Sequence, residues 1–158
     1  MSNQILNLLV VLFTTLFYLV AAIKYLSSFF YKISKPMTNA TLLLFCSVLL
    51  GFGVTLYQFS DVATNAMYFF ASKGSIFNGV WYWILFSLFA FVFSIGTFYF
   101  TFYLIGLLTH ENEKAELAKN NYFIACLHGI VFLILCFMVS KPIVDLANTM
   151  VSYPKFPD

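Results

Sequence analysis

The chain has 158 residues, of which 62% are hydrophobic and only 9% are charged, whereas soluble domains carry roughly 25% charged residues. A soluble fold of this composition would expose large apolar surfaces to water, so we predict an integral membrane protein that is surrounded by lipid. The formal net charge is only +2, and the lysines are scattered along the chain, which excludes a nucleic-acid-binding role.

Four apolar stretches follow each other along the chain, and each reaches the length of about 20 residues that a helix needs to cross a bilayer. We therefore predict an all-α fold with four transmembrane helices in a single domain, residues 1–158. This leaves no room for a soluble catalytic domain. The predicted helices cover residues 5–31, 40–70, 78–108 and 120–150, the last with a kink near Pro142.

The first predicted helix is longer than the core of a signal peptide and no basic residue precedes it, so we expect it to be retained as a membrane span. Pro36 follows it and ends the helix. In the second predicted helix, Ser47, Gly51 and Thr55 are spaced by four residues. This pattern lets two helix backbones approach closely in lipid, so we expect that face to contact another helix.

The third predicted helix carries small and hydroxyl-bearing residues at alternating intervals of three and four. They are Ser87, Ala90, Ser94, Thr97 and Thr101, and we call them the small-residue face. The spacing places them on one side of the helix. It predicts either tight packing against a neighbouring helix or, in an oligomer, a pore lined by hydroxyl groups.

Residues 110–119 are the most charged segment, and we expect them to form a solvated loop. Glu111 with Lys114 and Glu116 with Lys119 are spaced by three residues, which supports a helical turn. Five of the eight lysines lie on or near this side of the predicted bundle. By the positive-inside rule, we expect this loop in the cytoplasm and both termini outside, in a bacterial inner membrane.

Two segments of the chain resemble each other, residues 61–67 and 145–151. Each follows an apolar stretch and contains an aspartate, an alanine and a neighbouring threonine and asparagine. This similarity suggests an internal repeat, in which a unit of two helices occurs twice. Because two helices return the chain to its starting side, the copies would be related by an axis along the membrane normal.

The passages Thr38-Asn39-Ala40 and Lys119-Asn120-Asn121 each open an apolar stretch with small residues. Together with the two-copy pattern, they resemble the YjfL-like family of small bacterial inner-membrane proteins, which are built from duplicated two-helix units and known as a domain of unknown function. The Gly-Asn that is usual in that family is absent at these positions. The resemblance implies four spans, and it assigns no chemistry and no functional residues.

Ionisable side chains in or beside membrane spans are candidates for function, because placing a charge in lipid is costly. Four such residues stand out: Asp61, Asp145, His128 and Lys141. For the two aspartates, helix capping or interfacial solvation competes with a role in conduction or coupling. For His128, a hydrogen bond inside the bundle competes with a proton-sensitive or ligand-binding role. Lys141 could pair with Asp145, four residues later.

No combination of a nucleophile, a base and an acid occurs, and there is no glycine-rich phosphate loop. The three cysteines lie in apolar stretches without metal-ligand spacing, and His110 lies at a different depth from His128, so we predict no metal site, no haem and no other cofactor. We therefore expect a non-enzymatic, oligomeric membrane protein, either a pore or a membrane-signalling component. The alternative is a structural or accessory subunit that binds a partner membrane subunit in a larger complex.

Overall fold

The computed structural model of the chain describes residues 2–109 and 112–150. The described part contains five helices and no strand, and four of these helices are long and apolar enough to cross a membrane. This confirms the predicted all-α fold with four membrane spans. The helices are α1 (Ser2–Ile33), α2 (Asn39–Ser72), α3 (Ile76–Thr109), α4 (Glu113–Ala118) and α5 (Tyr122–Met150).

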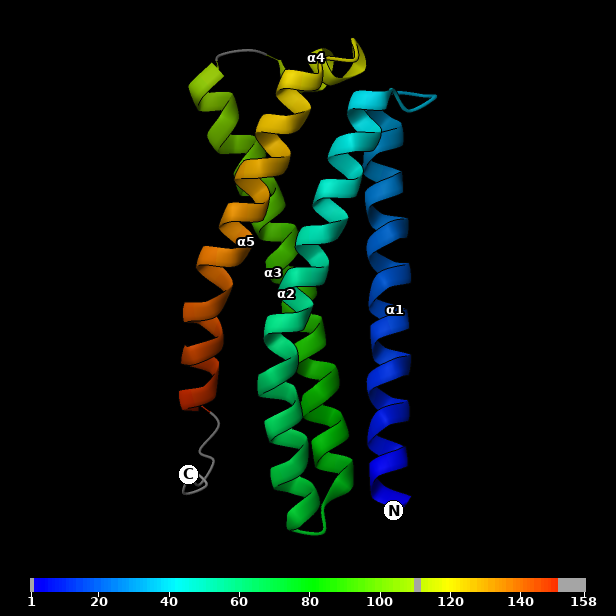
Figure 1. Cartoon of the computed structure of the whole chain (residues 1–158), viewed down its shortest axis with the longest axis vertical. Helices are drawn as coiled ribbons and strands as arrows, with labels where there is room; N and C mark the ends of the chain where they lie inside the picture. The colour runs from blue at the N-terminus through cyan, green and yellow to red at the C-terminus, as the bar shows by residue number, and fades with distance from the viewer. Residues whose placement is uncertain (1, 110–111, 151–158) are drawn as a thin grey trace.

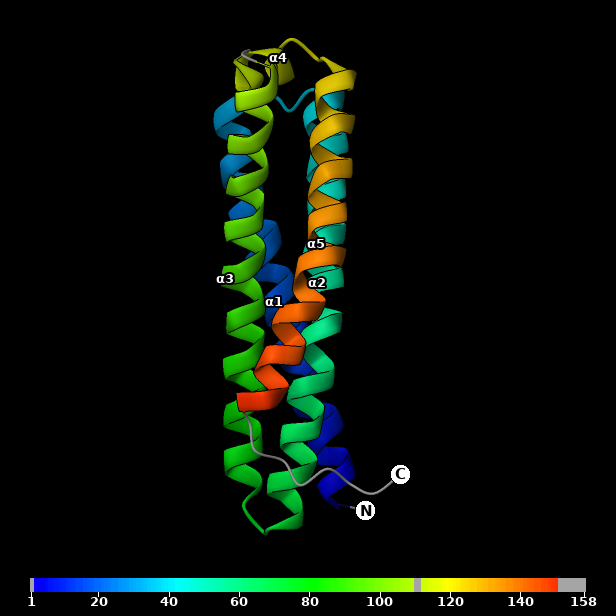
Figure 2. The same cartoon turned by 90° about the vertical axis from the view of Figure 1, so that its left-hand side faces the viewer.

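The four long helices run side by side along the longest axis of the molecule (Figure 1). Helix α2 is the centre of the bundle, because it packs extensively against both α3 and α5. Helix α1 is peripheral: in the most apolar part of each span, 17% of the α1 residues are buried against 39% of the α2 residues. The short helix α4 lies across one end of the bundle, beside the connection between α1 and α2 (Figures 1 and 2).

Aromatic rings fill the interior between the long helices. Phe30, Phe52, Phe98 and Phe132 are almost completely buried. The Phe98 and Phe132 rings meet edge to face at 6.1 Å, and the Phe52 and Phe132 rings lie 6.4 Å apart. In lipid, where apolar burial does not drive helices together, such close packing is what holds the bundle.

Helices α2 and α5 approach each other most closely at glycine. A Cβ atom at Gly51 would overlap the ring of Phe132, and one at Gly129 would lie 2.8 Å from Ser47 Oγ. The face of α2 that carries Ser47, Gly51 and Thr55 therefore packs against α5. The buried Thr55 hydroxyl donates to the Gly51 carbonyl at 2.9 Å, so its polarity is satisfied within α2.

Helix α5 continues through Pro142 to Met150. Proline removes one backbone hydrogen bond and its ring crowds the preceding turn. Figure 2 shows α5 changing direction in its lower part, and in Figure 1 this part lies at the outer edge of the bundle, on the far side of α2 from the lower part of α3.

Candidate functional site

Helix α4 carries an acidic side chain into the end of the bundle. Asn112 caps this helix, because its Oδ1 accepts a hydrogen bond from the Ala115 N–H at 3.3 Å. Glu113 and Leu117 lie one turn apart and therefore face the same way. Both are buried. The prediction that this segment is solvated is therefore wrong for its inward face.

Two hydrogen bonds fasten the segment around α4 to the start of α2. The Thr38 hydroxyl donates to the Leu117 carbonyl at 2.9 Å, and the Ala40 N–H donates to Asn120 Oδ1 at 2.9 Å. The Ala40 N–H is among the first amides of α2, which have no partner within their own helix. Asn120 thus caps α2 from a segment far away in the sequence, and it does so from a left-handed backbone conformation with φ of 64°.

The buried carboxylate of Glu113 meets the imidazole of His128. Glu113 Oε2 lies 3.1 Å from His128 Nε2, and the side chains are 7% and 1% exposed. His128 Nδ1 lies 2.9 Å from the Ile124 carbonyl oxygen. The Phe102 ring packs on the imidazole with 4.5 Å between centroids. Helices α3, α4 and α5 together therefore hold an acid and a base in contact, shielded from water.

The second carboxylate oxygen of Glu113 has no hydrogen-bond partner among the described residues, although it is buried. It lies against Gly106 of α3, where an added Cβ atom would be 3.2 Å from it. The absence of a side chain at Gly106 leaves the space that this oxygen occupies. A buried oxygen without a partner is energetically costly, so it identifies a strained position in the structure.

The exposed side of α4 carries a second, ordinary ion pair. Lys119 Nζ donates to Glu116 Oε1 at 2.8 Å, and Asn121 Nδ2 donates to Glu116 Oε2 at 3.1 Å. These hydrogen bonds, that from Lys119 first, lower the pKa of Glu116 below its usual value. Lys114 Nζ lies 5.7 Å from the centre of the Phe29 ring of α1. Its predicted partner Glu111, like His110, lies outside the described residues.

The small-residue face of α3 lies mostly inside the bundle. Ala90, Ser94, Thr97 and Thr101 are buried, whereas Ser87 is half-buried. Ser94 Oγ donates to the Ala90 carbonyl at 2.9 Å, and Thr101 donates to the Thr97 carbonyl at 2.8 Å. These hydroxyl groups are therefore satisfied by the carbonyls of their own helix, in positions that other helices cover.

Ser94 also takes part in a contact among three helices. The Tyr18 hydroxyl of α1 donates to the Phe52 carbonyl of α2 at 3.0 Å and lies 3.3 Å from Ser94 Oγ of α3. Tyr18 is 3% exposed. A side chain in the middle of α1 therefore links the peripheral helix to the centre of the bundle.

Three of the four ionisable candidates from the sequence lie on the surface. Asp61, Lys141 and Asp145 are exposed, and the ion pairs in the described part of the chain involve none of them. The expected pairing of Lys141 with Asp145 is therefore wrong. His128 is the candidate that the structure places in the interior, and its partner Glu113 was not predicted from the sequence.

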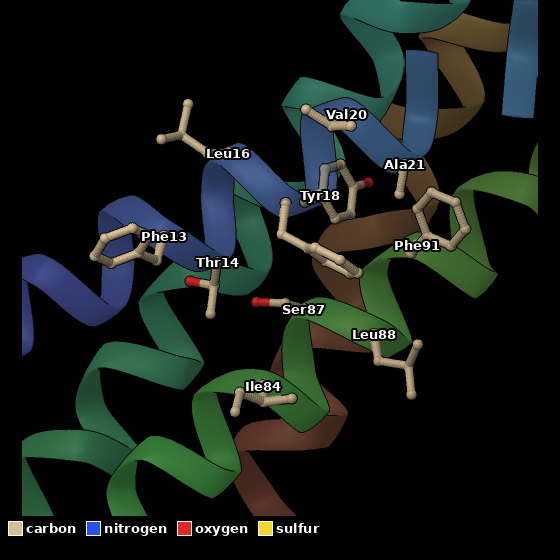
Figure 3. A pocket seen from close by; sticks show the side chains of 11 residues that line it. Phe13, Thr14, Leu16, Tyr18, Val20, Ala21, Ile84, Ser87, Leu88 and Phe91 are labelled. Atoms are coloured by element: carbon tan, nitrogen blue, oxygen red, sulfur yellow. The ribbon is translucent and has the colours of Figure 1, made fainter. Parts of the chain in front are cut away.

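An apolar groove lies between α1 and α3, with a volume of about 740 Å³ (Figure 3). Thr14 of α1 faces Ser87 of α3 in Figure 3, and Phe17, Leu88 and Phe91 also line the groove. Its lining contains no charged side chain. Neither Glu113 nor His128 is among the residues that line the groove.

No family model, curated protein or solved structure matches the chain. The resemblance to the YjfL-like family and the internal repeat therefore stay predictions. Within residues 2–109 and 112–150, no three histidine, cysteine, aspartate or glutamate side chains gather closely enough to hold a metal ion. The Glu113–His128 contact is accordingly a two-residue site.

Proposed function

We propose that the protein is a non-enzymatic membrane-signalling component whose moving part is α4, and that it works as an oligomer or as a subunit of a membrane complex. The observation that carries this proposal is the buried contact of Glu113 with His128. Ionisable groups in the interior of a membrane bundle are costly and mark functional sites. Two apolar side chains in contact at this place would hold α4 without the free-energy cost of removing an acid and a base from water.

The size and attachment of α4 support its mobility. The helix has six residues, and isolated helices shorter than about 12 residues are marginal in water. It is held by the buried side chain of Leu117, by the Glu113–His128 contact and by the hydrogen bonds that Thr38 and Asn120 make. Each such bond contributes about 1 kcal/mol, so the docked and released positions differ by only a few kcal/mol, which a signal can overcome.

The placement of the small-residue face favours signalling over a pore. The hydroxyl groups of Ser94 and Thr101 are buried in the bundle and donate to carbonyls of α3. They would have to turn outward to line a channel between protomers. The excess of lysines near the α4 side supports the predicted orientation, with α4 in the cytoplasm and the protein in a bacterial inner membrane.

The proposal is tested by measuring whether α4 moves. Spin labels at Ala115→Cys on α4 and Leu42→Cys on α2, both exposed positions, report the distance between the two helices in nanodiscs. The native cysteines at positions 46, 126 and 136 are replaced first. Expected are two distance populations whose ratio changes with conditions. A single unchanging distance, also after Glu113→Ala, would contradict the signalling function.

A flux assay separates signalling from permeation. In liposomes, we expect the purified protein to conduct no more ions than empty vesicles. A conductance that falls when Ser94 or Thr97 is replaced by valine would instead show that the small-residue face lines a pore.

The groove between α1 and α3 supports a second candidate, the structural or accessory subunit. Its volume of about 740 Å³ and its uncharged lining suit apolar side chains of a partner membrane subunit. A photo-crosslinking residue at Phe17 or Leu88, both exposed, would then capture one fixed partner protein in native membranes. The same residue at Leu50, exposed on α2, is the control and should capture none.

A further inference from the structure

We infer that the Glu113–His128 contact is a proton-binding site and that loss of its proton releases α4 from the end of the bundle. This inference rests on the proposed function, in which α4 is the moving part. It adds the chemical signal to which the movement responds.

The geometry of the imidazole requires a proton between the two side chains. A carbonyl oxygen can only accept a hydrogen bond, so His128 Nδ1, which lies 2.9 Å from the Ile124 carbonyl, carries a hydrogen. If His128 is neutral, its Nε2 is then a bare acceptor. Nε2 lies 3.1 Å from Glu113 Oε2, and two acceptors at this distance repel each other. The contact is attractive only when one further proton is present.

That proton can sit on either partner. With the proton on Nε2, a histidinium ion faces a carboxylate, whereas with the proton on Oε2 a neutral carboxylic acid donates to a neutral imidazole. Both arrangements give the pair a net charge of zero, so the proton belongs to the contact and not to one residue. Removing the proton leaves a buried carboxylate facing a lone pair, and adding a second proton leaves a buried cation.

Among the described residues, Glu113 forms no ion pair other than the contact with His128. Helix α1 also contacts α4, and Lys32 in its last turn forms no ion pair with Glu113. On α4 itself, Lys114 lies over the Phe29 ring of α1, and Lys119 is paired with Glu116. From α3 and α5, the contacts with the pair come from uncharged groups, the ring of Phe102, the backbone at Gly106 and the carbonyl of Ile124. On α2, the residues that bind the α4 segment are Thr38, just before the helix, and Ala40. The groups in direct contact with the pair are therefore uncharged.

The strain of the deprotonated pair is relieved by movement of α4. His128 belongs to the long apolar helix α5, which lies against α2, whereas Glu113 opens the short α4. The free oxygen of Glu113 has no hydrogen bond to lose. Outward movement of α4 brings the carboxylate to the polar boundary of the membrane, where water solvates it. Loss of one proton is thus converted into a change of position.

The experiment measures the distance between the labels at positions 115 and 42 in nanodiscs over a pH series. In the otherwise unchanged protein, we expect the ratio of docked to released α4 to fall by up to about tenfold per pH unit. This slope of one linked proton applies over the pH range in which docked α4 holds the proton and released α4 does not. Glu113→Gln is the decisive variant. Its amide donates to neutral His128 Nε2 without a proton that can be lost, so α4 should stay docked as the pH rises.

Two further variants complete the test. Glu116→Gln removes an exposed carboxylate from the same helix and should leave the alkaline release of α4 unchanged. Glu113→Ala removes the contact and should raise the released fraction of α4 to the same extent at every pH. If Glu113→Ala releases α4 but pH does not, the proton site is overturned while the proposed function stands. If α4 remains docked in Glu113→Ala as well, the proposed function fails too.

Discussion

Glu113 Oε2 and His128 Nε2 lie 3.1 Å apart in the interior of a four-helix membrane bundle, although the two residues belong to different helices. Their contact joins the charged connection between α3 and α5 to the apolar body of the protein. Because both side chains are buried, the connection cannot leave the bundle without exposing an acid and a base that are otherwise shielded. The contact therefore couples the position of the connection between α3 and α5 to the packing of the membrane bundle.

Replacement of His128 by alanine should destabilise the fold through Glu113. The variant leaves the carboxylate buried without any partner, at an expected cost of about 1 to 3 kcal/mol in the free energy of unfolding. Unfolding by a denaturing detergent, followed by circular dichroism, measures this cost. The double variant with Glu113→Ala should be less destabilised than the sum of the single variants, since it removes the unpaired group as well. Additive effects would show that the two side chains do not interact.

The close approach of α2 and α5 predicts opposite outcomes for two neighbouring glycines. Gly51→Ala places a Cβ atom in the volume of the Phe132 ring and should cost about 1 to 3 kcal/mol of stability through overpacking. Gly53→Ala meets nothing within 4 Å, and it should be neutral or stabilise by up to about 1 kcal/mol through helix propensity. The same unfolding assay compares them. Equal effects would mean that α2 and α5 do not meet at Gly51.

The membrane spans could be predicted because apolar length alone determines them. The spacing of Ser47, Gly51 and Thr55 likewise indicated a packing face. Residues spaced by one helical turn share a face of their own helix, and this can be recognised without knowing which helix packs against it. Which helix covers it, here α5 through Phe132, depends on tertiary packing that periodicity does not describe. The same limit applies to Tyr18, whose partners Phe52 and Ser94 come from two other helices.

The burial of Glu113 was missed for a different physical reason. The pairs Glu111 with Lys114 and Glu116 with Lys119, each spaced by three residues, suggested a solvated helical turn. This prediction holds for Glu116 and Lys119. Glu113 lies on the opposite side of the same turn, where Leu117 is the apolar residue one turn later. The sequence offered one indication of this buried side, the apolar Leu117 within an otherwise polar segment. Only the fold reveals that Gly106 leaves space for the carboxylate.

The attachment of α1 to the bundle should depend on the hydroxyl of Tyr18. Tyr18→Phe removes its hydrogen bond to the Phe52 carbonyl and its contact with Ser94, and should cost about 0.5 to 1.5 kcal/mol of stability. Tyr57→Phe is the matched control, because the Tyr57 side chain is 74% exposed and should tolerate the change. Proteolysis of α1 in detergent should accelerate for the first variant only. An equal response of both variants would argue against the three-helix contact.

The exposed pair on α4 predicts a second, acidic pH response. Hydrogen bonds from Lys119 and Asn121 lower the pKa of Glu116, so the folded state binds this proton more weakly than the unfolded state. The stabilisation of α4 is therefore fully present above the usual glutamate pKa of about 4.3 and is lost as the pH falls through the lowered value. Because the pair is solvent-exposed, high salt should weaken the effect.

The measurement uses the Glu113→Gln background, which removes the buried carboxylate and with it the expected alkaline release of α4. There, the labels on α4 and α2 should show α4 loosening as the pH falls, and a further Glu116→Gln replacement should abolish that loosening, since a neutral amide cannot lose its charge. An acidic response that survives in the double variant would assign it to another group. Loosening of α4 as the pH rises in this background would contradict the assignment of the alkaline response to Glu113 and His128.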